Sequence, residues 1–90
     1  MLDVKDAVQR AKDYLAALYQ SEGLSDLRLE EVERSDDGYW YVTLGFLRRA
    51  ASVDNPIISA LREMRRDYKV LKIDANSGDV LAMKMRSPAA

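Results

Sequence analysis

Residues 4–19 carry apolar side chains on one face of a helix, which is the clearest structural signal in the chain. The apolar positions follow steps of three and four residues: Val4, Ala7, Val8, Ala11, Tyr14, Leu15, Leu18 and Tyr19. Asp3 is a favourable N-cap, and Gly23 suits the left-handed position that ends a helix. The pattern predicts a long helix over residues 4–21 that must bury one face against another element.

Four later segments have the composition of β-strands. We expect them at 27–34, 39–47, 68–75 and 80–86, and 39–47 is the strongest because it is dense in aromatic and β-branched residues. Asp36-Asp37-Gly38 predicts a hairpin turn, and residues 76–79 predict a second one. Imperfect alternation within 27–34 indicates a bulge near Glu30-Glu31, and Gly45 suggests a bend or a close backbone approach.

These elements predict an α+β fold, in which one long N-terminal helix packs on an antiparallel four-stranded sheet. The expected order is α-β-β-(short α or loop)-β-β, within a single domain over residues 1–90. Residues 48–67 are expected to be a variable loop or a short helix that begins at Asn55-Pro56, and 87–90 a tail. The sheet face toward the helix is expected to hold the core: Trp40, Val42, Leu44, Phe46, Leu71, Ile73, Leu81, Met83 and Met85.

Composition narrows the function by exclusion. The 90 residues include no cysteine and no histidine, which removes thiolate zinc sites, thiol nucleophiles and the commonest general base. Serines therefore lack an activating histidine, and a Ser-Lys pair has no supporting motif. A calcium loop counted from Asp74 fails, because its sixth and twelfth positions are Asp79 and Met85. We expect no catalytic residue, no cofactor and no metal site, and hence no enzyme.

The N-terminal sequence and the apolar runs bear on the compartment. The chain begins Met-Leu-Asp-Val-Lys-Asp, without the basic start and apolar stretch of a secretory signal. No apolar run approaches the length of about 18–20 residues that spans a bilayer. We expect a cytoplasmic protein that does not contact a membrane.

The C-terminal string YKVLKIDANSGDVLAMKMR resembles the closing hairpin of PepSY-like domains. In those domains an aromatic-led strand runs into V/I-D-A, a T/S-G turn and a second apolar strand. The long helix with Ala7 and Ala11, followed by a strand pair, is also similar, so the likeness covers the helix and all four strands. The resemblance implies a cystatin-like fold and a non-catalytic role, and the chain is most similar to small stand-alone bacterial proteins of this fold whose function is unknown.

The sheet face turned away from the helix is the most informative surface. A single helix covers one face of a sheet, so the other face keeps five apolar residues without obvious cover: Tyr39, Tyr41, Leu47, Tyr68 and Val70. Exposed aromatic groups of this kind indicate a protein interface. The alternative is that the segment from Ile57 to Met64 folds over them and completes the core.

Charge is unevenly distributed along the chain. Residues 1–45 carry five basic and ten acidic side chains, whereas residues 46–90 carry nine basic and five acidic ones. Helical spacing would place four basic residues in one stripe: Arg62, Arg65, Arg66 and Lys69. The stripe is a candidate anion or nucleic-acid surface, but a net charge of −1 favours a solvated face paired with the acidic half.

These observations together favour a small protein-interaction module. The expected partner is a second copy of the chain, giving a homodimer, or another protein bound through the face that holds Tyr39 and Tyr68. Weak binding of nucleic acid or a phosphate ligand by the basic stripe is the alternative.

Overall fold

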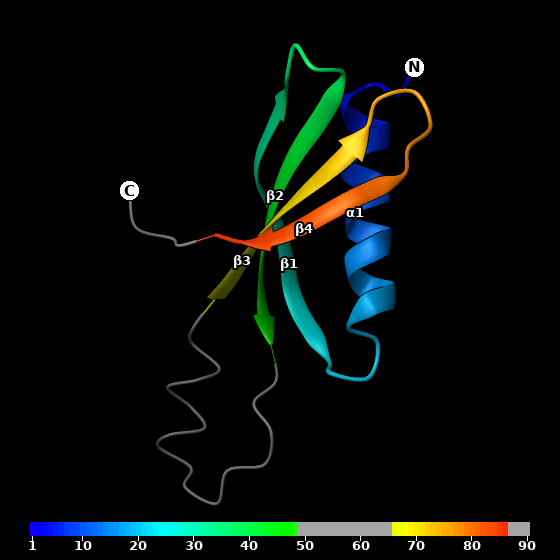
Figure 1. Ribbon diagram of the computed structural model, residues 1–90. Helices are drawn as coiled ribbons and strands as arrows, with labels where there is room; N and C mark the ends of the chain where they lie inside the picture. The colour runs from blue at the N-terminus through cyan, green and yellow to red at the C-terminus, as the bar shows by residue number, and fades with distance from the viewer. Residues whose placement is uncertain (49–65, 87–90) are drawn as a thin grey trace, which may run out of the picture.

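A computed structural model of the protein describes residues 1–48 and 66–86. In this part of the chain, helix α1 (Val4–Leu18) packs on an antiparallel four-stranded sheet (Figure 1). The strands lie side by side in sequence order: β1 (Leu24–Arg34), β2 (Tyr39–Arg48), β3 (Arg66–Asp74) and β4 (Val80–Met85). The predicted α+β class with one helix and four antiparallel strands is confirmed. Of the segment 48–67, predicted as a variable loop or a short helix, the ends belong to β2 and β3, and residues 49–65 lie outside the described residues.

Helix α1 begins where the sequence predicts but ends earlier. The backbone N–H of Asp6 donates to Asp3 Oδ1 at 2.8 Å, and Asp6 Oδ2 accepts from the Asp3 N–H, so the two residues form a capping box. The predicted end at residue 21 is wrong, because the helix stops at Leu18 and a turn occupies residues 19–22. Gly23 has the expected positive φ of 67°, but it ends that turn rather than the helix.

The core lies between α1 and the sheet. Alternate residues of β2 and β3 meet one face of the helix, as the two periodicities require. The fully buried apolar side chains are Ala7, Ala11, Leu15, Val42, Leu44, Phe46, Leu71 and Ile73. Trp40 and Met83 are partly buried against this cluster, in agreement with the predicted core face.

Two residues predicted for the core lie outside it. Leu81 is 52% exposed and Met85 is 81% exposed, so their assignment to the core is wrong. The pairing of β3 with β4 shifts by one residue, because Ile73 pairs with Val80 whereas Lys72 pairs with Ala82. Leu81 is the extra residue of this bulge, and Val80 takes the inner position against the core.

Strand β1 is longer and less regular than predicted. It begins at Leu24 rather than residue 27, and its pairing with β2 shifts between Ser25 and Arg28 and again between Leu29 and Glu31. The second shift confirms the bulge predicted near Glu30-Glu31. Asp26 has a positive φ of 51° at the first shift, which breaks the alternation that would mark the start of the strand.

The N-terminal residues fasten α1 to the end of the sheet. The backbone N–H of Leu2 donates to the carbonyl oxygen of Ala75 at 2.7 Å, and Trp40 Nε1 donates to the Leu2 carbonyl at 3.2 Å. Ala75 follows β3, which runs from residue 66 to 74 rather than over the predicted 68–75. These bonds fix where the helix begins over the sheet.

Candidate interaction face

The sheet has one face away from α1, which we call the open face. Because side chains alternate along a strand, the neighbours of the buried Val42, Leu44 and Phe46 point to this face. All five residues of the predicted interface lie on it, and each is half-buried: Tyr39, Tyr41, Leu47, Tyr68 and Val70. The structure therefore brings the five together on one surface that no described helix covers.

Gly45 lies on the open face, where two side chains approach the backbone closely. A Cβ added at this glycine would lie 2.7 Å from Glu30 Oε1 and 3.1 Å from Tyr68 Cε1. The close approach suggested by the sequence is thus confirmed. The missing side chain leaves the space in which the Tyr68 ring and the Glu30 carboxylate meet.

A polar contact spans three strands at the centre of the open face. Arg86, just after β4, donates from Nη1 to the hydroxyl of Thr43 at 2.9 Å and lies 3.1 Å from Glu31 Oε2. Thr43 is almost fully buried, so the bond satisfies a hydroxyl within the sheet. Arg86 and Glu31 are each about half exposed, so their ion pair orders the side chains more than it stabilises the fold.

The tyrosines of β2 are also held by polar neighbours. The Lys72 ammonium lies 4.2 Å from the centre of the Tyr39 ring, within the range of a cation–π contact. The Tyr41 hydroxyl donates to Asp37 Oδ2 at 3.1 Å. Burial and this bond to the Asp37 carboxylate both raise the pKa of Tyr41. Both rings are therefore held by contacts within the protomer.

The predicted basic stripe does not form from its described members. In β3, Arg66 pairs with Leu47 and Lys69 pairs with Leu44, which places the two residues on opposite faces of the sheet. Arg66 is 17% exposed and is engaged by Asp26, with its Nη1 lying 2.7 Å from Asp26 Oδ2. Arg62 and Arg65 lie outside the described residues.

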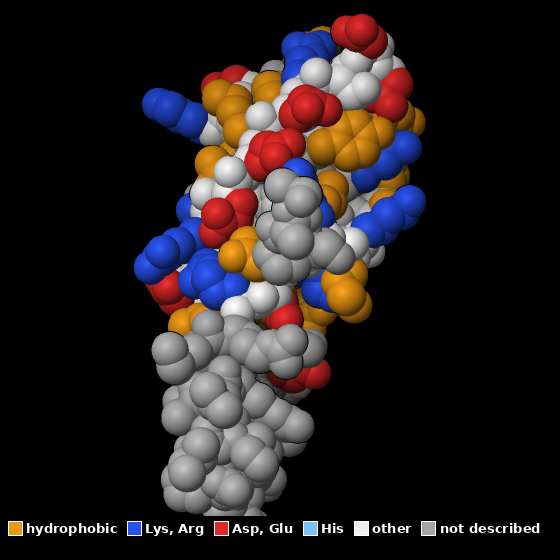
Figure 2. Space-filling view, turned by 90° about the vertical axis from the view of Figure 1, so that its left-hand side faces the viewer, with side chains coloured by type: hydrophobic (Ala, Val, Ile, Leu, Met, Phe, Trp, Pro, Cys, Tyr) orange, Lys and Arg blue, Asp and Glu red, His pale blue; other side chains and the backbone are white. Residues whose placement is uncertain are grey.

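Charge on the open face is divided between its two sides. Glu30, Glu31 and Glu33 extend from β1 beside Arg28, which is paired with Asp26, while the other side carries Lys72, Lys84 and Arg86. Figure 2 views the molecule from the side of the open face and shows hydrophobic groups interleaved with acidic and basic ones. The visible surface is a mixed one with aromatic groups, not a continuous apolar patch.

Acid is expected to weaken the fold through two aspartates, Asp74 at the end of β3 and Asp26 near the start of β1. Asp74 Oδ1 accepts from the backbone N–H groups of Ser77 at 3.0 Å and Asn76 at 2.8 Å, and these bonds lower the pKa of Asp74. The pKa of Asp26 is lowered as well: burial acts to raise it, but Arg28 and Arg66 together outweigh that effect. A carboxylate with a lowered folded pKa stabilises the fold above its unfolded pKa of about 3.9 and loses this contribution as pH falls through the folded value.

We therefore expect the urea midpoint of the protein to fall below about pH 4. The Asp74→Asn variant keeps a hydrogen-bond acceptor but has no charge to titrate, so its midpoint should fall less over the same range. Urea unfolding followed by circular dichroism at a series of pH values measures both decreases. Asp36→Asn, in the other hairpin turn, is the matched control. Equal decreases in wild type and Asp74→Asn would contradict the role of this carboxylate.

Sequence reasoning located the five apolar residues but missed the polar contacts around them. The sequence pattern assigns no role to Lys72 and Arg86, whereas in the structure they contact Tyr39 and Thr43. The signal that would have found Lys72 is the register between β2 and β3, in which it pairs with Tyr41 and lies next to Tyr39. No comparable signal exists for Arg86, because its side chain crosses strand β3 to reach β2 and β1.

Two further features that can give a chain a function are a metal site and a membrane-spanning helix. Within 1–48 and 66–86, no group of three acidic side chains has the arrangement of a metal site, and no helix is long and apolar enough to cross a membrane. No family model, curated protein or solved structure matches the chain. The resemblance to PepSY-like domains stays a prediction, and the open face is the candidate site that the geometry defines.

Proposed function

We propose that the protein is a non-enzymatic interaction module that binds a second copy of itself through the open face. The composition of this face supports the proposal, because tyrosine and arginine are enriched where proteins meet. Tyr39, Tyr41 and Arg86 are already ordered by neighbouring side chains, which reduces the entropy lost on binding.

The division of charge is the observation that favours a second copy as the partner. In a face-to-face dimer with its twofold axis along the strands, β1 of one protomer lies over β4 of the other. The acidic side of each open face, with Glu33, then faces the basic side with Lys84, while Glu31 and Arg86 stay paired within each protomer. Such complementarity selects the partner and fixes its orientation, and salt screens it.

Val70 tests this proposal because it lies near the centre of the open face, between Thr43 and Lys84. Val70→Glu places a carboxylate beside Lys84, which the folded protomer tolerates, but it buries that charge in the dimer. We expect the dissociation constant of the dimer to rise at least about tenfold, equivalent to about 1.4 kcal/mol. Sedimentation equilibrium over a range of protein and salt concentrations measures the change.

Val4→Glu is the matched control, since Val4 is an exposed valine at the start of α1 and a glutamate is favourable there. This variant should associate like the wild type. A wild-type chain that stays monomeric at every concentration would refute the proposal. So would a Val70→Glu variant that associates as strongly as the wild type.

A further inference from the structure

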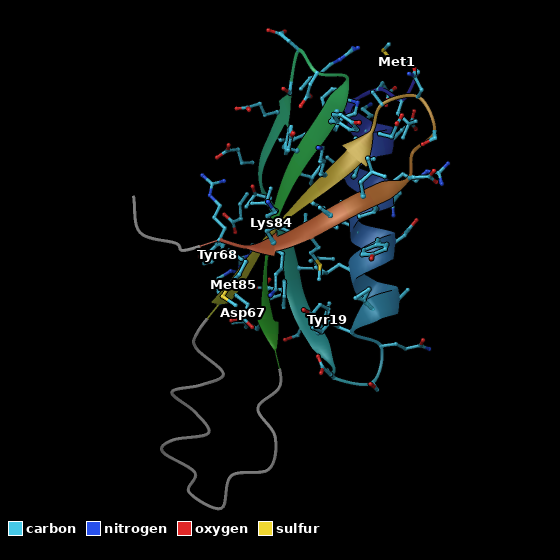
Figure 3. The ribbon with its side chains drawn as sticks, in the orientation of Figure 1. Met1, Tyr19, Asp67, Tyr68, Lys84 and Met85 are labelled. Carbon is cyan, nitrogen blue, oxygen red and sulfur yellow. The ribbon has the colours of Figure 1, made fainter. Side chains whose placement is uncertain are left out.

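Within residues 1–48 and 66–86, β4 has no neighbour on its outer edge, and it carries the most exposed apolar side chains of the sheet. β4 ends the sheet opposite to β1, and Leu81 and Met85 expose 52% and 81% of their surface. Met83 lies between them on the same side of the strand, partly buried against the core. Figure 3 shows Lys84 and Met85 on opposite sides of β4, near its end. Apolar groups thus line the helix side of a free edge.

Two of these residues, Met83 and Met85, turn their backbone groups outward. The N–H of Arg86 donates to the carbonyl of Tyr68 at 2.9 Å, so this pair is hydrogen-bonded across β3 and β4. In an antiparallel ladder the hydrogen-bonded pairs alternate, which directs the N–H and C=O groups of Lys84 and Ala82 toward β3 as well. The backbone groups of Met83 and Met85 therefore point away from the sheet and offer a second ladder, which begins just after the bulge at Leu81.

The other edge of the sheet is protected from such pairing. β1 contains two register shifts and a residue with positive φ, Asp26, which interrupt its outer ladder. It also carries six charged side chains along its length, from Asp26 to Arg34. Bulges and charges of this kind hinder edge-to-edge association, whereas β4 has a single bulge, at Leu81 near its start, and Lys84 as its single charge. With one usable edge, pairing closes on itself as a dimer and does not propagate.

We infer that β4 pairs antiparallel with β4 of a second copy around a twofold axis at Met83. This register places Leu81 directly opposite Met85 of the second copy, and does so twice because of the symmetry. Each exposed apolar side chain thereby covers the other, and the outward backbone groups of both strands are satisfied. In this register β4 is complementary to a second β4, because each strand offers one Leu81 and one Met85 to the other. We therefore choose a second copy of the chain as the partner over an unrelated peptide.

The resulting assembly is a continuous eight-stranded sheet with both helices on one side. The two open faces then lie next to each other on the opposite side. This contact uses a surface distinct from the open face and does not depend on the proposed function. If both contacts form, the chain assembles beyond a dimer, whereas the β4 contact alone gives a dimer with a doubled open face.

Cysteine pairs test the register, because the chain has no cysteine of its own. Opposite residues in the proposed ladder have Cα atoms about 5.5 Å apart, which a disulfide spans. The double variant L81C/M85C should therefore give mostly disulfide-linked dimer under mild oxidation, seen on a non-reducing gel. The single variants L81C and M85C are the matched controls, since the two copies of one such cysteine would be about 13 Å apart, too far for a bond.

Hydrogen exchange of the wild-type chain provides a second measurement that needs no substitution. The amides of Met83 and Met85 should exchange more slowly as protein concentration rises, while the outer amides of β1 should not change. Crosslinking of the double variant no greater than that of the single variants would overturn the inference. Exchange at Met83 and Met85 that does not depend on concentration would overturn it as well. Loss of association in Val70→Glu with the β4 crosslink intact would separate the two contacts.

Discussion

Phe46→Ala is expected to lower the free energy of unfolding by about 3–5 kcal/mol. Phe46 is fully buried and is the largest of the fully buried side chains in the described part of the chain. Its ring lies 5.7 Å from that of Tyr19, centre to centre, so it joins the end of α1 to the middle of the sheet. Truncation removes this contact and leaves a cavity that the rigid strands on either side cannot fill.

The loss is large for a domain of this size, whose unfolding free energy is expected within about 5–15 kcal/mol. Urea unfolding followed by circular dichroism gives the difference directly. Leu29→Ala is the control: Leu29 is an exposed residue of edge strand β1, and its truncation should cost well under half as much. A Phe46→Ala protein within about 1 kcal/mol of the wild type would contradict the placement of Phe46 at the centre of the core.

The part of the fold that sequence predicted well depends on periodicity. Val42, Leu44 and Phe46 recur at every second position of a β-rich segment, and that period assigns them to one face whatever the rest of the chain does. The hairpin at Gly38 followed from a residue that adopts positive φ without strain, and its φ is 89°. These are local properties, and local properties can be read from neighbouring residues.

The errors arose where pairing between strands decides the outcome. Val80 and Leu81 are both apolar, so the pattern alone could not show which of them packs against the core and which one the bulge leaves exposed. Helical spacing joined Arg66 with Lys69, but in β3 the same spacing separates them onto opposite faces. The aromatic open face was predictable because its residues alternate with the core. The cross-strand contact of Arg86 with Thr43 was not, since it depends on register and side-chain conformation together.

Leu15→Ala is expected to cost about 2–5 kcal/mol of unfolding free energy, because it removes the anchor that holds α1 on the sheet. Ala7, Ala11 and Leu15 are the buried residues of the helix, and Leu15 is the largest of them. Small residues at the first two positions bring the helix close to the strands. Leu15 then supplies most of the apolar surface that this layer buries.

Leu18→Ala is a closely matched control in the same helix. The change in helix propensity and the groups removed are identical, but Leu18 is 50% exposed and lies at the end of α1. The difference between the two unfolding free energies, measured by urea titration, therefore isolates burial against the sheet. We expect Leu15→Ala to be the less stable by at least about 1.5 kcal/mol. Equal losses would mean that α1 does not dock through Leu15, and the division of the sheet into a covered face and an open face would fail with it.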